Sequence, residues 1–175
     1  MKTTNQGNSW SQISPDLSKS KNSFSAGAIA ESPLQKGLLY YGSDKGSFWV
    51  SKDDGKSWNE NSKNIKDNYI RSIYPSKFLK SRVYMAMTGI NYDDLGNYIY
   101  MSENYGKDWK TIKSNLPNEP ANVIIEDLKY ENVLYAGLYR GVYISFDKGK
   151  SWSILGKKLP IVSISDLIID EKSGD

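Results

Sequence analysis

Hydrophobic and polar positions alternate along this chain in short runs, each bounded by Gly, Ser, Asn or Asp. A period of two is typical of β-strands, and the frequent polar punctuation argues against long helices. The pattern predicts three groups of four strands: 26–31, 38–42, 47–51 and 57–61, then 69–74, 82–87, 98–102 and 108–113, then 122–126, 133–138, 142–145 and 151–155. Two further strands are expected at 10–13 and 162–170.

The groups align with one another position by position, which supports this register. The second strand of each group carries an apolar residue followed by tyrosine, as Leu39-Tyr40, Val83-Tyr84 and Leu134-Tyr135. The third strand ends on serine, as Trp49-Val50-Ser51, Tyr100-Met101-Ser102 and Tyr143-Ile144-Ser145. Aromatic residues in such columns are expected to pack between neighbouring sheets, and stacking against a ligand is the alternative.

An eight-residue turn motif, Ser/Thr-x-Asp/Asn-x-Gly-x-Ser-Trp, follows the third strand of each group. It occurs at 3–10, 51–58, 102–109 and 145–152, and we call these four segments the repeat turns. Asp or Asn accepts hydrogen bonds from turn backbone, Gly adopts positive φ, and Trp buries a large ring as the next strand begins. The defining residues are Asn5, Gly7, Trp10, Asp53, Gly55, Trp58, Asn104, Gly106, Trp109, Asp147, Gly149 and Trp152.

The spacing of the repeat turns predicts the architecture. Successive tryptophans of the motif lie 48, 51 and 43 residues apart, a spacing typical of β-propeller blades. We therefore expect an all-β propeller of four-stranded antiparallel blades, with 1–13 as the end of one blade, a linker at 14–23, and 162–170 as the first strand of a further blade. The complete blades are 24–61, 69–113 and 122–155. Three complete blades cannot close a ring, so an incomplete propeller fragment is expected.

Composition removes several function classes. The chain contains no His and no Cys, which excludes Ser-His-Asp catalysis, thiol chemistry and the usual zinc sites. Its 23 basic and 20 acidic residues are dispersed, and the longest basic run is Lys157-Lys158, so no nucleic-acid surface is expected. No apolar run reaches transmembrane length, and residues 1–4 do not resemble a signal peptide. We expect no cofactor and no metal.

The repeat turns resemble the Asp-box, or BNR repeat, of sialidase-type and sortilin-type propellers. Further segments resemble a bacterial sortilin-like (VPS10-type) subfamily whose members are often labelled glycosyl hydrolases: 14–17, 30–33, 134–137 and 141–149. The resemblance implies a larger propeller in an exported protein, extracellular or periplasmic. It also implies that the box is a structural turn on the face opposite most binding sites, with calcium binding as the minor alternative.

Candidate binding residues are therefore sought on the other face. The connections between second and third strands, and from each fourth strand to the next blade, share that face. They present Lys45, Arg140 and the longest insertion, 89–96, with Tyr92, Asp93 and Asp94. Long loops on a rigid scaffold often carry function, and a solvated loop with a turn-forming Asp pair is the alternative.

Catalytic residues are harder to assign. Arg71, Arg82 and Arg140 do not lie in the sequence contexts of the sialidase arginine triad, and no Tyr–Glu nucleophile pair accompanies them. Glu31 and Glu126 hold equivalent places on innermost strands, and if they line the central channel they could form the carboxylate pair of a glycosidase.

Two functions remain. The first is a non-catalytic binding or scaffold module that presents loops to a protein, peptide or carbohydrate ligand. The second is part of a carbohydrate-active enzyme whose active site lies partly in other blades.

Overall fold

The structure, a computed structural model, describes residues 1–17, 20, 25–156 and 160–170. The predicted linker at 14–23 and the predicted blade start at residue 24 therefore lie partly outside the described residues. Lys157-Lys158 and residues 171–175 lie wholly outside them.

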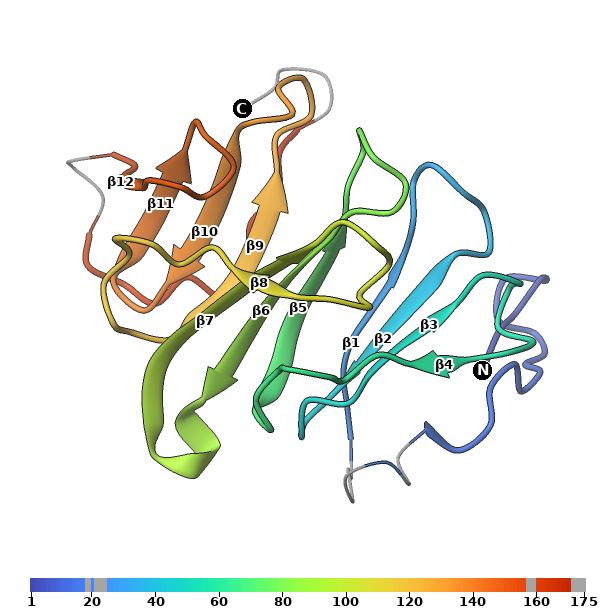
Figure 1. The fold of residues 1–175 in the computed structure, drawn as a ribbon. Helices are drawn as coiled ribbons and strands as arrows, with labels where there is room; N and C mark the ends of the chain where they lie inside the picture. Colours follow the sequence, from blue (N-terminus) through green and yellow to red (C-terminus); the bar gives the residue numbers. More distant parts are fainter. Residues whose placement is uncertain (18–19, 21–24, 157–159, 171–175) are drawn as a thin grey trace.

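Three antiparallel four-stranded sheets make up the described chain, and each takes its strands in chain order (Figure 1). The first sheet holds β1 (Ala26–Glu31), β2 (Leu39–Ser43), β3 (Phe48–Ser51) and β4 (Asn59–Glu60). The second holds β5 (Tyr69–Pro75), β6 (Val83–Gly89), β7 (Asp94–Ser102) and β8 (Lys110–Thr111). The third holds β9 (Ala121–Glu126), β10 (Leu134–Leu138), β11 (Gly141–Ser145) and β12 (Ser153–Ile154). Each strand predicted for the three groups overlaps one of these strands.

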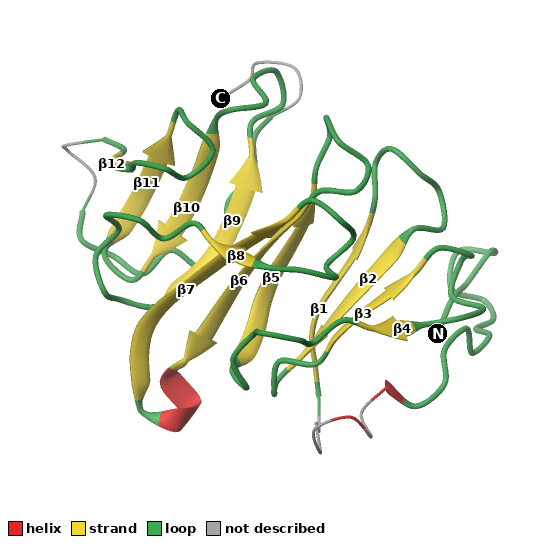
Figure 2. Cartoon of the chain, viewed as in Figure 1, coloured by secondary structure: helices red, strands yellow, loops and turns green. Residues whose placement is uncertain are grey.

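Helical structure is almost absent from the residues that the structure describes (Figure 2). The insertion at 89–96, expected as a loop, contains a short 3-10 helix, η2 (Ile90–Tyr92), followed by Asp93 at φ 56°. Strand β7 then begins at Asp94, opposite Gly89, so that the β6–β7 hairpin is longer than expected.

Two expected strands are not formed. Residues 162–170 have no regular secondary structure, and within 10–13 only Ser11 pairs, in an isolated bridge with Lys2. A strand is defined by its ladder to a neighbour, and the described residues supply no ladder for either segment. Residues 162–170 instead pass along the third sheet, where Ile164 N–H donates to Leu138 O at 3.0 Å.

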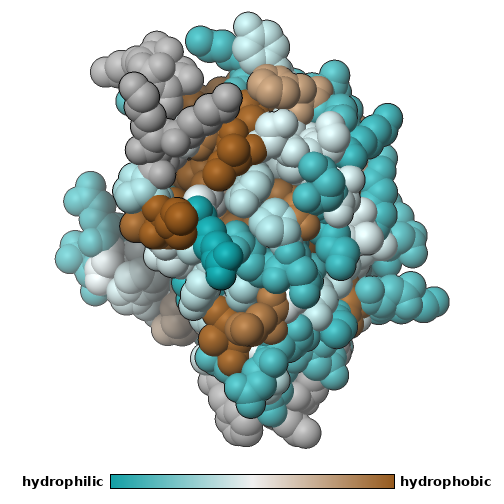
Figure 3. All heavy atoms as spheres, turned by 90° about the vertical axis from the view of Figure 1, so that its left-hand side faces the viewer, coloured by the Kyte–Doolittle hydropathy of each residue, from teal (hydrophilic) through white to brown (hydrophobic). Residues whose placement is uncertain are grey.

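The hydrophobic core lies between the sheets. One buried cluster, with Tyr40, Phe48 and Ile70, joins the first sheet to the second, and another, with Tyr84 and Ile124, joins the second to the third. The second sheet is covered on both faces, and consequently all seven residues of β6 are buried. The side of the third sheet away from the second keeps apolar patches among polar residues (Figure 3), in line with the exposure of Ile154, Ile161 and Ile168.

The four repeat turns share one hydrogen-bond pattern. In the second turn, Ser51 Oγ accepts from Gly55 N–H at 2.8 Å, and Asp53 Oδ1 accepts from Ser57 N–H at 2.9 Å. The two central residues, Asp54 and Gly55, both have positive φ, 63° and 86°, as a type I′ turn requires. The side chains of the motif therefore bond two backbone N–H groups of their own turn.

Each of the last three repeat turns also attaches its sheet to the segment before it. The indole Nε1–H of Trp152 donates to Ile112 O at 2.8 Å, and that of Trp109 approaches Asn61 O at 3.4 Å. Gly106 lies so close to the first sheet that a Cβ on it would come within 2.3 Å of Phe48. Trp58 contacts the chain near Ile13 in the same way. These turns thus set the spacing between sheets.

Candidate ligand-binding hollow between the second and third sheets

A β-bulge recurs at the start of the innermost strand of every sheet. The register shifts at Gly27 in β1, at Arg71 in β5 and at Asn122 in β9. A bulge leaves one residue outside the ladder and changes the direction of its side chain, which is why bulges are common next to functional sites. In the second and third sheets the bulged residues are polar, and both face the same hollow.

This hollow has a volume of about 370 Å³. It lies between the second and third sheets, among β5, β6, β9 and β10. It is at the end of these sheets where η2 connects β6 to β7 (Figure 1). Its walls are polar and aromatic, formed by Tyr69, Arg71, Thr88, Ile90, Asn91, Asn122, Tyr139, Ser163 and Ser165. Among the residues that the structure describes, the walls contain one cation, Arg71, and no carboxylate.

The hollow is partly fixed by hydrogen bonds. Asn122, 6% exposed, donates from Nδ2 to Ile164 O at 2.9 Å and holds residues 163–165 against the third sheet. Thr88 Oγ1 accepts from Ile90 N–H at 3.4 Å, which ties η2 to β6. The Arg71 guanidinium lies 5.7 Å from the centre of the Tyr69 ring. Among the described residues no acidic side chain forms a salt bridge with Arg71.

None of the loop residues proposed from sequence lines the hollow, although Tyr92 and Arg140 directly follow the lining residues Asn91 and Tyr139 in the chain. Tyr92, 48% exposed, extends from η2 towards the β2–β3 turn that contains Lys45, and its hydroxyl reaches Asp44 O at 3.5 Å. Arg140 is exposed, and its Nε lies 3.6 Å from the Glu119 carboxylate. Sequence reasoning missed Asn122 and Tyr139, because the bulge that places Asn122 depends on pairing with β10.

The Asp93-Asp94 pair builds the hairpin turn. Asp94 accepts hydrogen bonds from the Tyr98 hydroxyl at 2.7 Å and from Gly96 N–H at 3.0 Å. These bonds, with the hydroxyl as the largest effect, lower the pKa of Asp94 to about 2. Asp93 is exposed in the left-handed conformation. The geometry agrees with the turn-forming alternative for this pair.

The expectation that Glu31 and Glu126 could line a channel is wrong for Glu126. Its side chain is 0% exposed and accepts from Tyr84 Oη at 2.9 Å and Ser76 Oγ at 2.7 Å. It is buried because the second sheet packs directly over the end of β9. Glu31 is exposed and accepts from Gly37 N–H at 2.7 Å, so the two carboxylates do not form a pair.

Arg82 is part of the same buried network. It is 3% exposed and lies 2.9 Å from Glu131, 3.1 Å from Glu103 and 3.5 Å from Glu126. Burial, reinforced by the Glu126 charge, raises the pKa of Tyr84. Arg82 therefore joins two sheets at the repeat-turn end, and the structure does not bring it together with Arg71 and Arg140.

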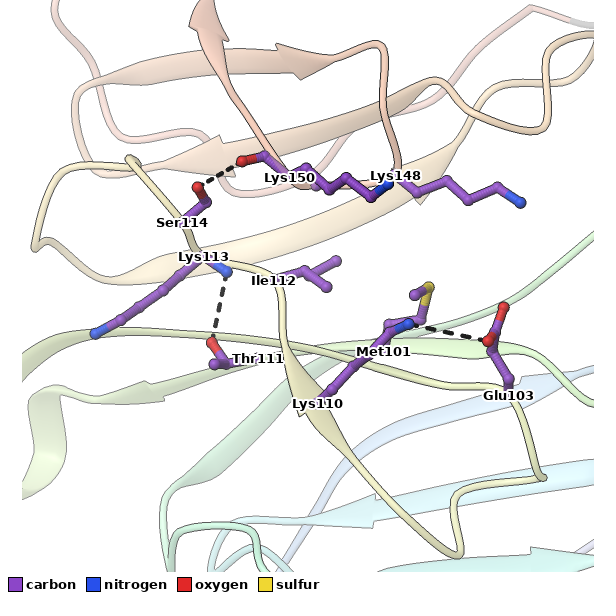
Figure 4. A pocket seen from close by; sticks show the side chains of 10 residues that line it. Met101, Glu103, Lys110, Thr111, Ile112, Lys113, Ser114, Lys148 and Lys150 are labelled. Atoms are coloured by element: carbon purple, nitrogen blue, oxygen red, sulfur yellow. Dashed lines mark hydrogen bonds and ion pairs between the residues drawn. The ribbon is translucent and has the colours of Figure 1, made fainter.

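A second groove, of about 600 Å³, runs between β8 and the repeat turn of the third sheet (Figure 4). Four lysines line it, but their ammonium groups point in different directions. Lys110 lies 3.9 Å from Glu103, and Lys148 is 2.7 Å from Glu131. The groove is therefore not organised around a single anion, and the hollow is the better candidate site.

Comparison with known proteins assigns the fold to a family. The family model Sortilin-Vps10, described as sortilin, neurotensin receptor 3, matches residues 46–160, which is most of the chain. The chain belongs to this family. A comparison with curated proteins found no match in sequence.

Solved structures show that the three sheets are propeller blades. An ancestral GH74 enzyme superposes with a TM-score of 0.69 at 20% identity, over 89% of this chain and 21% of its own. The GH74 enzyme of Niastella koreensis gives 0.60 at 16% identity, over 75% and 22%. YCF48 from Cyanidioschyzon merolae gives 0.57 at 15% identity, over 76% and 37%. At these identities the likeness establishes the fold alone, and this chain spans about a fifth of the GH74 chains.

Two searches of the described residues concern other kinds of site. None of their helices has the length and apolar character needed to cross a membrane. The described part of the chain also holds no cluster of three or more acidic side chains that could ligate a metal ion.

Proposed function

We propose that this chain is a non-catalytic propeller segment that acts as a binding module of an exported sortilin-like protein. Its ligand site is the hollow between the second and third blades. The repeat turns are Asp-boxes with a structural role, and Lys45, Tyr92 and Arg140 lie around the site on the same face. Residues 1–13 and 162–170 contribute to neighbouring blades of a larger propeller.

The composition of the hollow carries this proposal. Glycoside hydrolysis usually needs two carboxylates on either side of the scissile bond. The described walls of the hollow hold amides, hydroxyls, tyrosine rings and Arg71, and none of these described residues is Asp or Glu. Such walls can orient a polar ligand through hydrogen bonds and ring contacts, and their described residues offer no carboxyl group for its cleavage.

The alternative is a share in a carbohydrate-active enzyme. The similarity to GH74 enzymes favours it, because one of the similar structures is a xyloglucanase from Xanthomonas campestris. In that case the hollow forms one wall of a cleft, and the catalytic carboxylates are supplied by other blades.

Ligand mapping by nuclear magnetic resonance tests the proposal. The purified chain is titrated with three probes: a neutral xyloglucan oligosaccharide, an oligogalacturonate and a short peptide. We expect at least one probe to shift the amide signals of the hollow and to bind less tightly to Tyr139→Ala. Tyr130→Ala is the matched control, since Tyr130 is also exposed and does not line the hollow.

Hydrolysis is measured on the same samples. The proposal predicts no release of reducing sugar from either oligosaccharide. Turnover by this chain that is lost in Glu31→Gln would refute the non-catalytic proposal. Titrations in which no probe shifts the hollow would show that it is not the binding site.

A further inference from the structure

The charge of the hollow indicates which ligand it suits. Arg71 projects from the bulge of β5, is exposed, and has no salt-bridge partner among the described residues. The other two arginines differ from it, because Arg82 is surrounded by glutamates and Arg140 lies beside Glu119. A guanidinium with no acidic neighbour in a concave site favours a ligand that brings its own negative charge.

The rest of the wall supplies neutral polar groups next to this cation. Asn91 is exposed on η2, and Thr88 is buried near the end of β6. Ser163 and Ser165 lie on the opposite side, on the segment that Asn122 holds in place. Tyr139 is 43% exposed and presents part of its ring to solvent. The hollow thus combines one positive charge, several hydroxyl or amide groups and an accessible aromatic ring.

We propose that the hollow binds an acidic sugar, with the uronate carboxylate on Arg71 and the sugar hydroxyls on the surrounding amides and hydroxyls. This inference rests on the proposed function and names its ligand class. A volume of about 370 Å³ lies at the small end of the range typical of ligand sites, which suits one or two sugar rings.

A peptide C-terminus would bring the same carboxylate, but the hollow fits it less well. Peptide termini are usually captured by converging backbone N–H groups. Here the polar groups of the wall are mainly side chains, and Ile90 N–H is already bonded to Thr88. Side-chain amides, hydroxyls and a tyrosine ring are the groups that match the many hydroxyls and the flat faces of a sugar.

Paired ligands test the role of the carboxylate. Binding of digalacturonate and of its dimethyl ester is measured by calorimetry on the purified chain, and the site is located by chemical-shift mapping. We expect the acid to bind at least about tenfold more tightly than the ester, since a charge-assisted hydrogen bond is worth roughly that factor or more. The amide signals of Arg71, Asn91 and Tyr139 should shift with the acid.

Paired variants test Arg71. Arg71→Gln should remove most of the preference for the acid, and Arg71→Lys should retain part of it, because a lysine keeps the charge without the planar fork. Lys107→Gln is the control, because Lys107 is an exposed cation in the repeat turn 102–109 and does not line the hollow. Thermal unfolding of each variant verifies the fold, which a change at exposed Arg71 should leave intact.

The outcomes separate this inference from the proposed function. Equal binding of acid and ester, or unchanged binding in Arg71→Gln, would overturn the acidic-sugar assignment. So would a peptide that shifts the hollow when digalacturonate does not. In these cases a shift of the hollow by any probe still supports the binding module, whereas no shift by any probe would refute both.

Discussion

Two tyrosines hold equivalent positions in adjacent blades, but among the described residues only one of them has a hydrogen-bond partner for its hydroxyl. Substituting each by phenylalanine should therefore change the free energy of unfolding differently. Tyr84 and Tyr40 follow the first residue of the second strand in adjacent blades, and both are 0% exposed. Tyr84 donates its hydroxyl proton to Glu126 of the next blade at 2.9 Å. The Tyr40 hydroxyl is buried with no hydrogen-bond partner among the described residues. The difference arises because Pro75 occupies in β5 the position that Glu126 occupies in β9.

The expected energies follow from these contacts. Tyr84→Phe removes a hydrogen bond to a buried carboxylate and should lower the free energy of unfolding by ~1.5–3 kcal/mol. Tyr40→Phe removes a hydroxyl that burial had left unpaired, and it should therefore be neutral or stabilising by ~1–3 kcal/mol. Both substitutions keep the ring and the packing around it, so Tyr84→Phe should be the less stable variant by at least ~1.5 kcal/mol.

Urea unfolding, followed by tryptophan fluorescence, measures both changes. The slope of the unfolding free energy with urea should stay the same, so that a shift in midpoint reports stability. A Tyr40→Phe variant destabilised as much as Tyr84→Phe would refute the reasoning. It would mean that the Tyr40 hydroxyl has a partner, such as a buried water, that compensates for its burial.

Three further changes probe the repeat turns and the blade faces. Trp152→Ala should cost ~3–5 kcal/mol in unfolding free energy as a large-to-small core change, whereas Trp10→Ala should cost little because Trp10 is 57% exposed. Hydrogen bonds from Ser151 lower the pKa of Asp147 from 3.8 to about 2, so its contribution to stability is present above pH ~4 and is lost as the pH falls towards 2. Thermal unfolding between pH 2 and 6 should show this loss, and Asp147→Asn should flatten it. Ile29 is 72% exposed where its counterpart Ile124 is fully buried, so sedimentation should detect self-association that Ile29→Ser reduces.

The strands and turns were predictable from sequence because their causes are local. Alternation places residues on the two faces of a strand, and the Asp, Gly and Ser of a repeat turn bond to backbone within the same eight residues. Strand ends were less accurate where pairing decides them. Strand β4 is limited to Asn59–Glu60, both exposed at the sheet edge, although alternation had suggested 57–61.

The site could not be derived in the same way, because its features depend on two blades at once. Glu31 and Glu126 have the same place in the repeat, yet one is exposed and the other is buried under Tyr84 and Arg82. In the sequence, Arg71 is one of three arginines with no feature that sets it apart. Its distinction from Arg82 required the buried glutamates of the neighbouring blade.

The bulge explains how a structural repeat can carry a specific site. The repeat turns tie the blades together at one end. Their side chains already form hydrogen bonds to the backbone of their own turn and to the preceding segment. At the other end, the bulge removes one residue per innermost strand from the ladder and frees its side chain from any role in pairing. In the first blade that residue is Gly27, whose missing Cβ leaves room for Ile70 O. In the next two it is Arg71 and Asn122, which face one hollow. The scaffold therefore fixes where these side chains emerge, and under the proposed function the identity of the bulged residue determines what each blade can bind.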